Sequence, residues 1–180
     1  MPTDEDTKII ESCLAGDGKA FRMLMDRYER QLFNAAYRVL NDYEDAMDAT
    51  QSAFVKAYQN LHNFDTSRRF FSWIYRILLN ESLNIAKQRK RFDQLNDGIK
   101  VNARNPEERF DESETGRRVQ SAIMDLKTDH RVVIVLKHYQ GMSYREMSEV
   151  VGIPEKTIKS RLFSARQHLK DILMRKGLAR

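Results

Sequence analysis

One side of an expected helix carries two carboxylates, an amide and a hydroxyl, on Asp45, Asp48, Gln51 and Ser52. A helix advances about 100° per residue, so this spacing places all four side chains in one stripe. Two neighbouring carboxylates suit a metal ion or a general acid and base, as in a metal-dependent nuclease. Neither a histidine nor a nucleophile accompanies them. Because such a face usually is solvated or meets a basic partner, we favour a protein interface over catalysis.

A second polar face lies in the segment 70–91. Its members are spaced three or four residues apart: Trp73, Arg76, Asn80, Asn84, Lys87 and Arg91. Amides, cations and an aromatic ring suit a single nucleic-acid strand, because bases stack on rings, amides read base edges and cations follow phosphates. The residues by themselves leave a structural alternative equally open. In that alternative Trp73 and Tyr75 belong to the core, and the cations stabilise the C-terminal end of the helix.

A third face is cationic and belongs to the last expected helix, which begins at Pro154. The positions that the core does not use are Lys156, Lys159, Ser160, Phe163, Gln167 and Lys170, with Arg161 and Arg166 beside them. Lysine and arginine bind phosphates, and a helix in the DNA major groove reads base edges through Lys159, Ser160 and Phe163. A solvated charged face is the alternative. An exposed Phe163 among cations nevertheless indicates a surface that it contacts.

Apolar periodicity predicts the helices that position the first two faces. A short helix ends at Gly16, and a core helix spans about 19–40. The apolar stripe of that core helix is Phe21, Met25, Tyr28, Leu32, Ala35 and Val39. The next helix buries small residues that permit close approach of a neighbour, namely Ala46, Ala49, Ala53, Ala57 and Leu61. The fourth helix, about 70–91, buries Phe70, Ile74, Ile77, Leu78 and Ile85.

The second half of the chain predicts a helix-turn-helix. One helix from about residue 118 is followed by another that opens at Asp129 and ends at Gly141. Ser143 and Glu146 form the S-x-x-E capping box of a short helix, which Gly152 ends. The helix from Pro154 then buries Ile158, Leu162, Ala165, Leu169 and Ile172. A short helix, a glycine turn and a longer basic helix are the parts of that motif.

Composition and charge predict an all-α protein of two small domains. The 180 residues are 41% hydrophobic and 32% charged, with seven glycines and three prolines. Residues 67–91 hold seven Lys or Arg and one Glu, whereas residues 93–114 hold seven acids and three cations. Residues 154–180 are basic again. We therefore expect domains at 1–91 and 118–180 and a linker at 92–117.

Several classes of protein are disfavoured. The single cysteine, Cys13, forms no internal disulfide and is expected to be a partly buried core residue. No signal segment or bilayer-spanning apolar run is evident, so we expect a cytoplasmic protein without direct membrane insertion. The four histidines are scattered without ligand spacing, so neither a metal nor another cofactor is expected.

Three segments, taken in order, resemble the extracytoplasmic-function sigma factors of bacterial RNA polymerase. They are DYEDAMDATQSAFVKAYQNLHNF, FFSWIYRILLNESLNIAKQRKR and GMSYREMSEVVGIPEKTIKSRLFSARQHL. The resemblance runs from about residue 15 to residue 172. It implies a four-helix domain and a helix-turn-helix domain on a flexible linker, and a promoter-specificity subunit that leaves the chemistry to the polymerase.

The resemblance also implies roles for individual residues. Core polymerase, through its β′ clamp helices and β flap, is the implied partner, and the clamp helices would contact Asp45, Asp48, Gln51 and Ser52. The −10 promoter element would contact Phe64, Arg68, Arg69, Trp73, Arg76, Asn80, Asn84 and Lys87. The −35 element would contact Lys156, Thr157, Lys159, Ser160, Arg161, Phe163 and Arg166. An anti-sigma factor is a further implied partner.

Two positions depart from the family pattern, and two other functions compete with it. Ser52 stands where the family often has Glu, and Ser164 stands where it often has a basic residue. One competing hypothesis is a stand-alone helix-turn-helix regulator whose N-terminal half senses a ligand or partner. The other is the nuclease that would use Asp45 and Asp48.

Overall fold

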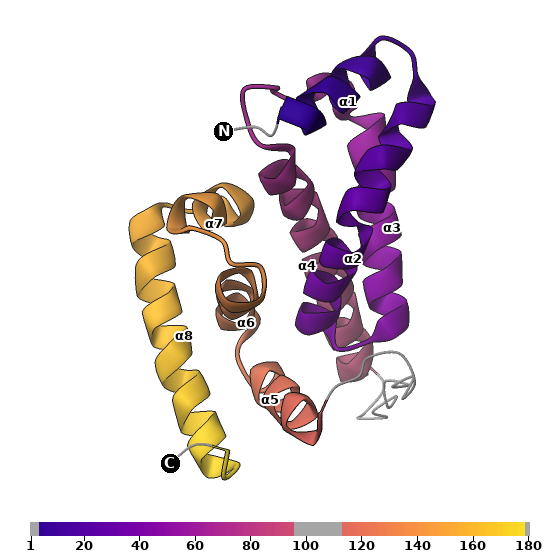
Figure 1. The fold of residues 1–180 in the computed structure, drawn as a ribbon. Helices are drawn as coiled ribbons and strands as arrows, with labels where there is room; N and C mark the ends of the chain where they lie inside the picture. The colour runs from indigo at the N-terminus through magenta and orange to yellow at the C-terminus, as the bar shows by residue number, and fades with distance from the viewer. Residues whose placement is uncertain (1–3, 96–112, 179–180) are drawn as a thin grey trace.

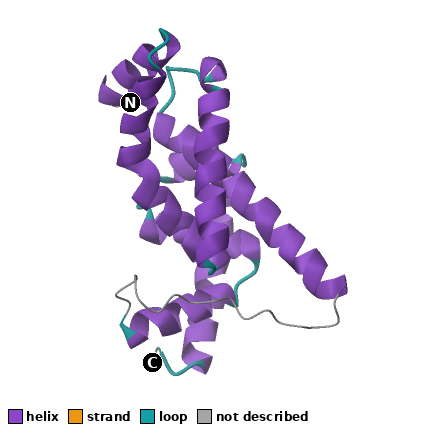
Figure 2. Ribbon diagram, turned by 90° about the vertical axis from the view of Figure 1, so that its right-hand side faces the viewer, coloured by secondary structure: helices purple, strands orange, loops and turns teal. Residues whose placement is uncertain are grey.

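The computed structural model describes residues 4–95 and 113–178, and the regular structure of these residues is entirely helical (Figure 2). The elements are α1 (Asp4–Leu14), η1 (Gly18–Ala20), α2 (Phe21–Leu40), α3 (Tyr43–Gln59), η2 (Leu61–Asn63), α4 (Phe70–Leu95), α5 (Glu114–Met124), α6 (Thr128–Ile134), η3 (Val135–Tyr139), α7 (Tyr144–Val151) and α8 (Glu155–Arg175). The expected all-α class is confirmed. Most of the expected linker, 96–112, lies outside the described residues.

The N-terminal module, residues 4–95, packs α2, α3 and α4 side by side, with α1 across one end (Figure 1). The alanines on the inner side of α3 make this packing close, because a methyl group lets a neighbouring backbone approach. Ala46, Ala49, Ala53 and Ala57 are all fully buried, as their spacing predicts. Cys13 is half-buried against the same core, also as expected.

The buried stripe of α2 differs from the expected one at a single turn. Met25 was expected in the core but is 39% exposed, whereas Leu24 is fully buried. The two positions lie about 100° apart, so either fits a stripe that passes through Phe21 and Tyr28. In α4, Ile77 and Ile85 are likewise only half-buried, because they lie at the edges of the contact surface rather than at its centre.

The C-terminal module, residues 113–178, contains the predicted helix-turn-helix in α7 and α8. Ser143 Oγ accepts from the Glu146 N–H, and the Glu146 carboxylate accepts from the Ser143 N–H, so both bonds of the capping box are present. Gly152 ends α7 at φ 76°, a left-handed conformation that glycine adopts without a Cβ penalty. The Ser148 hydroxyl then donates to the Ile153 carbonyl at 2.6 Å and holds the turn.

Both helices that border the expected linker are longer than the sequence pattern indicated. α4 continues to Leu95 rather than ending near Arg91, since no Gly or Pro interrupts it. α5 begins at Glu114, ahead of the expected Arg118, because Ser113 Oγ accepts from the Gly116 N–H at 3.1 Å and caps the helix. The two modules also pack against each other, α7 on α4 (Figure 1) and η3 on α2.

Candidate nucleic-acid interfaces

The helix α4 is divided lengthwise into a core side and a polar side. Phe70, Ile74, Tyr75 and Leu78 are buried on the core side. The polar side presents the expected donor-rich residues to solvent, namely Arg76, Asn80, Asn84 and Lys87. Trp73 is half-buried at the boundary. The structural alternative therefore holds for Tyr75, which is buried. The amides and cations from Arg76 to Lys87 form an open face, which is more than 15 Å long because a helix rises about 1.5 Å per residue.

Phe64 does not face solvent, although it was expected in a loop that meets a DNA strand. Its ring is only 8% exposed. It packs edge-on to Phe70 with centroids 5.8 Å apart, and against Trp73 at 5.0 Å. The short helix η2 turns the chain so that Phe64 folds back onto the start of α4, and this burial of three rings stabilises that end of the helix.

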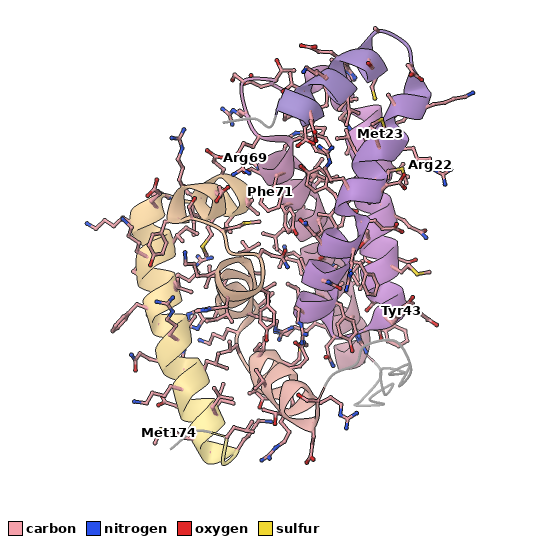
Figure 3. All side chains as sticks on the ribbon, in the orientation of Figure 1. Arg22, Met23, Tyr43, Arg69, Phe71 and Met174 are labelled. Atoms are coloured by element: carbon pink, nitrogen blue, oxygen red, sulfur yellow. The ribbon has the colours of Figure 1, made fainter. Side chains whose placement is uncertain are left out.

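The loop that leads into α4 is ordered by its own side chains. Asp65 Oδ1 accepts from the Ser67 N–H at 3.0 Å and from the Ser67 hydroxyl at 2.6 Å, and Arg68 lies 3.3 Å from Oδ2. These hydrogen bonds from Ser67, together with Arg68, lower the pKa of Asp65. Arg68 remains exposed. Arg69 instead forms an ion pair with Glu146 of α7, beside Phe71 at the start of α4 (Figure 3).

The outer face of α8 is open to solvent. Six of the seven expected DNA-contacting residues on it are exposed: Lys156, Thr157, Lys159, Ser160, Phe163 and Arg166. Phe163 is 65% exposed, the highest value among the large hydrophobic residues of the described chain. Phe163 thus offers an exposed apolar surface between the cations of this face. Lys159 Nζ lies 5.4 Å from the ring centroid of Tyr144, so α7 helps to position it.

Arg161 differs from its neighbours on α8. It is partly buried, and its Nη1 lies 3.4 Å from Asp129 Oδ2 of α6. Its guanidinium therefore holds α8 against α6 as well as bordering the exposed face. The spacing of Arg161 relative to Lys159 and Phe163 could not reveal this contact, because Asp129 comes from an earlier helix.

A pair of histidines also joins α6 to α8. The Nδ1 atoms of His130 and His168 are 3.0 Å apart, so one ring donates and the other accepts when both are neutral. Burial lowers the pKa of His130, and the neighbouring His168, Lys127 and Arg161 lower it further. The charged form of His130 is thus disfavoured in the folded module.

Acidification should therefore destabilise the C-terminal module. Because the folded state holds the pKa of His130 below its unfolded value, the unfolded chain binds more protons, and stability is lost as the pH falls below about 6.5. We expect the melting temperature followed by circular dichroism to fall between pH 7.5 and pH 5.5. His130→Gln should reduce this slope but not abolish it, because burial also lowers the pKa of His138. An equal slope in the variant would contradict the assignment.

The acidic stripe of α3 is only partly available. Asp48 and Gln51 are exposed and Ser52 is half-buried. Asp45 instead lies 3.3 Å from Arg89 of α4, which also approaches Asp42 at 3.5 Å. Burial raises the pKa of Asp45, and Asp42 adds to this, while Arg89 opposes it. Asp45 thus contributes to the α3–α4 contact, and Asp48 and Gln51 carry the outward face.

Exposed apolar side chains on α3 were missed by the sequence interpretation. Met47, Val55 and Tyr58 are between 42% and 54% exposed. With Gln51 they follow spacings of four, four and three, which place them along one side of the helix. That periodicity, apolar residues on the side away from the alanine stripe, is the signal that could have revealed them. Exposed Met and Tyr side chains are enriched at protein interfaces.

Among the described residues, no three His, Cys, Asp or Glu side chains are grouped so that they could hold a metal ion. In residues 4–95 and 113–178, no helix has the length and apolar character needed to cross a bilayer.

Comparison with known proteins identifies the two modules. Residues 24–92 match the family described as Sigma-70 region 2, and residues 116–169 match Sigma-70, region 4. The ECF RNA polymerase sigma factor SigW of Bacillus subtilis is 30% identical over 178 residues, which cover 92% of this chain and 95% of SigW. The RNA polymerase sigma-H factor of Pseudomonas aeruginosa is 29% identical over 185 residues, covering 96% of each chain.

Two solved structures share the fold. CnrH, in complex with the cytosolic domain of CnrY, has a TM-score of 0.73 and 28% identity, covering 94% of this chain and 97% of CnrH. The sigma factor RpoE of Bartonella quintana, in complex with the anti-sigma factor NepR, also has a TM-score of 0.73, with 26% identity, covering 87% of this chain and 98% of RpoE. The two matched regions occur in this order, SigW is 30% identical over nearly the full length of both chains, and the fold is shared. This chain therefore belongs to the extracytoplasmic-function sigma factors of bacterial RNA polymerase.

Proposed function

We propose that the protein binds core RNA polymerase, recognises the −35 and −10 elements of promoters and directs transcription initiation. The observation that carries this proposal is the presence of two donor-rich helical faces, on α4 and α8, in two modules of one chain that match regions 2 and 4. The N-terminal domain, expected at 1–91, would take the −10 element and the polymerase. The domain expected at 118–180 would take the −35 element.

The exposed face of α8 suits duplex DNA. Its lysines and arginines supply phosphate contacts, and Lys159, Ser160 and Phe163 lie where a helix in the major groove meets base edges. Phe163 has the apolar surface to contact a thymine methyl group. Ser164 is exposed beside this face and would add no charge to it.

The exposed face of α4 suits an unpaired strand. Asn80 and Asn84 offer both donors and acceptors to base edges, while Arg76 and Lys87 lie at positions that can follow phosphates. Phe64, Trp73 and Phe70 would support this face from below as a packed aromatic cluster. A base that stacks there would contact the half-buried Trp73 first.

We propose that α3 provides the main contact with polymerase through Asp48, Gln51 and the exposed apolar side chains beside them. Ser52 is half-buried and would contribute less than a glutamate at that position. An anti-sigma factor is a fitting regulator, since NepR is described as an anti-sigma factor in its complex with RpoE. The protein itself would perform no catalysis, and it would act in the cytoplasm with the polymerase.

Transcription with purified core polymerase and genomic promoter fragments tests the proposal. We expect the protein to form a complex with core polymerase and to start transcripts at fragments that core polymerase alone ignores. If the protein binds duplex DNA alone, forms no complex with core polymerase and directs no initiation, a stand-alone regulator is the correct assignment. Cleavage of the fragments would instead indicate a nuclease.

A further inference from the structure

A buried carboxylate of α1 lies behind the aromatic cluster at the start of α4. Asp6 is only 3% exposed, and burying a charge is unfavourable unless the charge is paired. The Arg27 guanidinium forms an ion pair with this carboxylate, and the Tyr28 hydroxyl donates to its Oδ2 at 2.5 Å. Two neighbouring residues of α2 therefore hold α1 in place.

Tyr28 connects this carboxylate to the aromatic cluster. Its side chain is buried, and its ring centroid lies 5.7 Å from that of Phe70 and 6.2 Å from that of Phe71. Both separations are in the range at which aromatic rings attract each other. The hydroxyl of Tyr28 is thus held by α1, while its ring packs on α4.

The ring contacts continue from Phe70 to the candidate −10 face. The centroids of Phe70 and Trp73 are 5.7 Å apart, and Phe64 contacts both rings. Trp73 is the half-buried ring at the boundary of the polar side of α4, where a stacking base would meet the cluster first. One hydrogen bond and two ring contacts therefore connect Asp6 to Trp73.

The Tyr28 phenol is kept as a hydrogen-bond donor. Burial raises its pKa, and the hydrogen bond to the Asp6 carboxylate and the negative charge of that group raise the pKa further, although Arg27 and Arg69 oppose this. A phenolate could not donate to a carboxylate. The contact between α1 and α2 is therefore made by a protonated phenol at neutral pH.

The hydroxyl of Tyr28 has a role that the ring alone could not fill. A phenylalanine at this position would keep the contacts with Phe70 and Phe71 but would leave Asp6 Oδ2 without its donor. Loss of one hydrogen-bond partner from a buried group is unfavourable. The hydroxyl therefore fixes where the ring lies, whereas the ring supplies the apolar contact.

We propose that Tyr28 is a positioning residue for the −10 strand: its hydrogen bond to Asp6 fixes the Phe70 ring, which in turn fixes Trp73 at the edge of the polar face. The helix α1 would then contribute to strand capture without contacting DNA. This inference rests on the proposed function in naming the −10 strand. The position of Trp73 can be measured in the free protein.

Two variants separate the hydrogen bond from the ion pair, and a third is the control. Tyr28→Phe keeps the ring and removes the bond. Asp6→Asn keeps an oxygen that can accept from Tyr28 but removes the charge that pairs with Arg27. Tyr43→Phe removes a hydroxyl at the end of the module away from α1 (Figure 3) and keeps the contact of its ring with Phe33 at 5.1 Å.

Fluorescence of Trp73 is the first measurement, because Trp73 is the single tryptophan of the chain. In Tyr28→Phe we expect emission at a longer wavelength and stronger quenching by acrylamide than in the parent, since the less firmly held ring is more open to water. Asp6→Asn and Tyr43→Phe should match the parent in both. Melting followed by circular dichroism should nevertheless show a lower melting temperature for Asp6→Asn, so that stability and the position of Trp73 vary independently.

Open complexes at a responsive promoter provide the second measurement. The reaction of permanganate with unpaired thymines reports the fraction of promoter that is open. For Tyr28→Phe, the holoenzyme concentration at half-maximal opening should rise about three- to tenfold, as expected if about a third to a tenth of the molecules hold Trp73 in the binding position. Core polymerase binding should be unchanged, because α3 carries the proposed polymerase contact.

Three results would overturn the proposal. The first is Trp73 emission and quenching in Tyr28→Phe that equal those of the parent. The second is a loss of opening that weaker core binding explains, and the third is an equal shift of Trp73 emission in Asp6→Asn or Tyr43→Phe. A parent protein that opens no promoter would count against the proposed function, whereas the Trp73 fluorescence would still decide whether Tyr28 positions the ring.

Discussion

The Asp48→Arg variant is expected to bind core RNA polymerase at least about tenfold more weakly than the wild-type protein, a loss of about 1.4 kcal/mol. Asp48 is exposed on the outward face of α3, beside the exposed Met47. If this face meets a basic surface of the polymerase, the substitution replaces an attraction with a repulsion between like charges. Fluorescence titration of labelled protein with core polymerase, in the absence of promoter DNA, measures the effect.

Asp171→Arg provides the control for this charge reversal. It makes the same change at an exposed position of α8, outside the proposed polymerase contact. We expect this control to bind core polymerase like the wild-type protein, and both variants to keep the wild-type melting temperature, since neither residue is buried. An unchanged affinity for Asp48→Arg would remove the outward face of α3 from the interface.

The Asn80→Ala variant should reduce initiation about tenfold while core polymerase binding stays intact. Asn80 lies in the middle of the exposed polar face of α4, where its amide can both donate to and accept from a base edge. Loss of a specific contact of this kind costs about 1–3 kcal/mol. Alanine is the better helix former, so the fold should not suffer. Abortive transcript yield at a responsive promoter measures the effect.

Gln88→Ala is the matched control for the loss of an amide. Gln88 is exposed on the same helix but lies about 80° around its axis from Asn80. Initiation by this control should equal that of the wild-type protein. Equal losses of initiation and core binding in Asn80→Ala would show instead that Asn80 has a structural role.

Helices and their inner sides could be read from local spacing. The alanines of α3 are fully buried, and the capping box of Ser143 and Glu146 has both of its bonds. Both features depend on residues within a few turns of one another, so the periodicity of the sequence is sufficient to predict them. The order of helices, with a glycine turn before α8, predicted the helix-turn-helix for the same reason.

Local spacing was less informative at the edges of helices. It could not tell whether Leu24 or Met25 is the buried residue, since both positions fit an apolar stripe of α2. The helices that pack against α2 bury Leu24 and leave Met25 exposed. It also placed Ile77 in the core, although the structure leaves it half-buried. The width of an apolar stripe depends on how many elements pack against it, and this number is a tertiary property.

The sequence by itself determined the all-α class, the helix-turn-helix and the outward faces of α4 and α8, because each follows from residues close together in the chain. Only the tertiary structure decided that Phe64 is buried, that Asp45 pairs with Arg89 and that Arg69 pairs with Glu146, 77 residues away. The physical reason is that an ion pair or an aromatic contact requires two particular side chains to meet. Which distant groups meet is decided by how the helices pack, and here that packing joins the two modules through α2, α4 and α7.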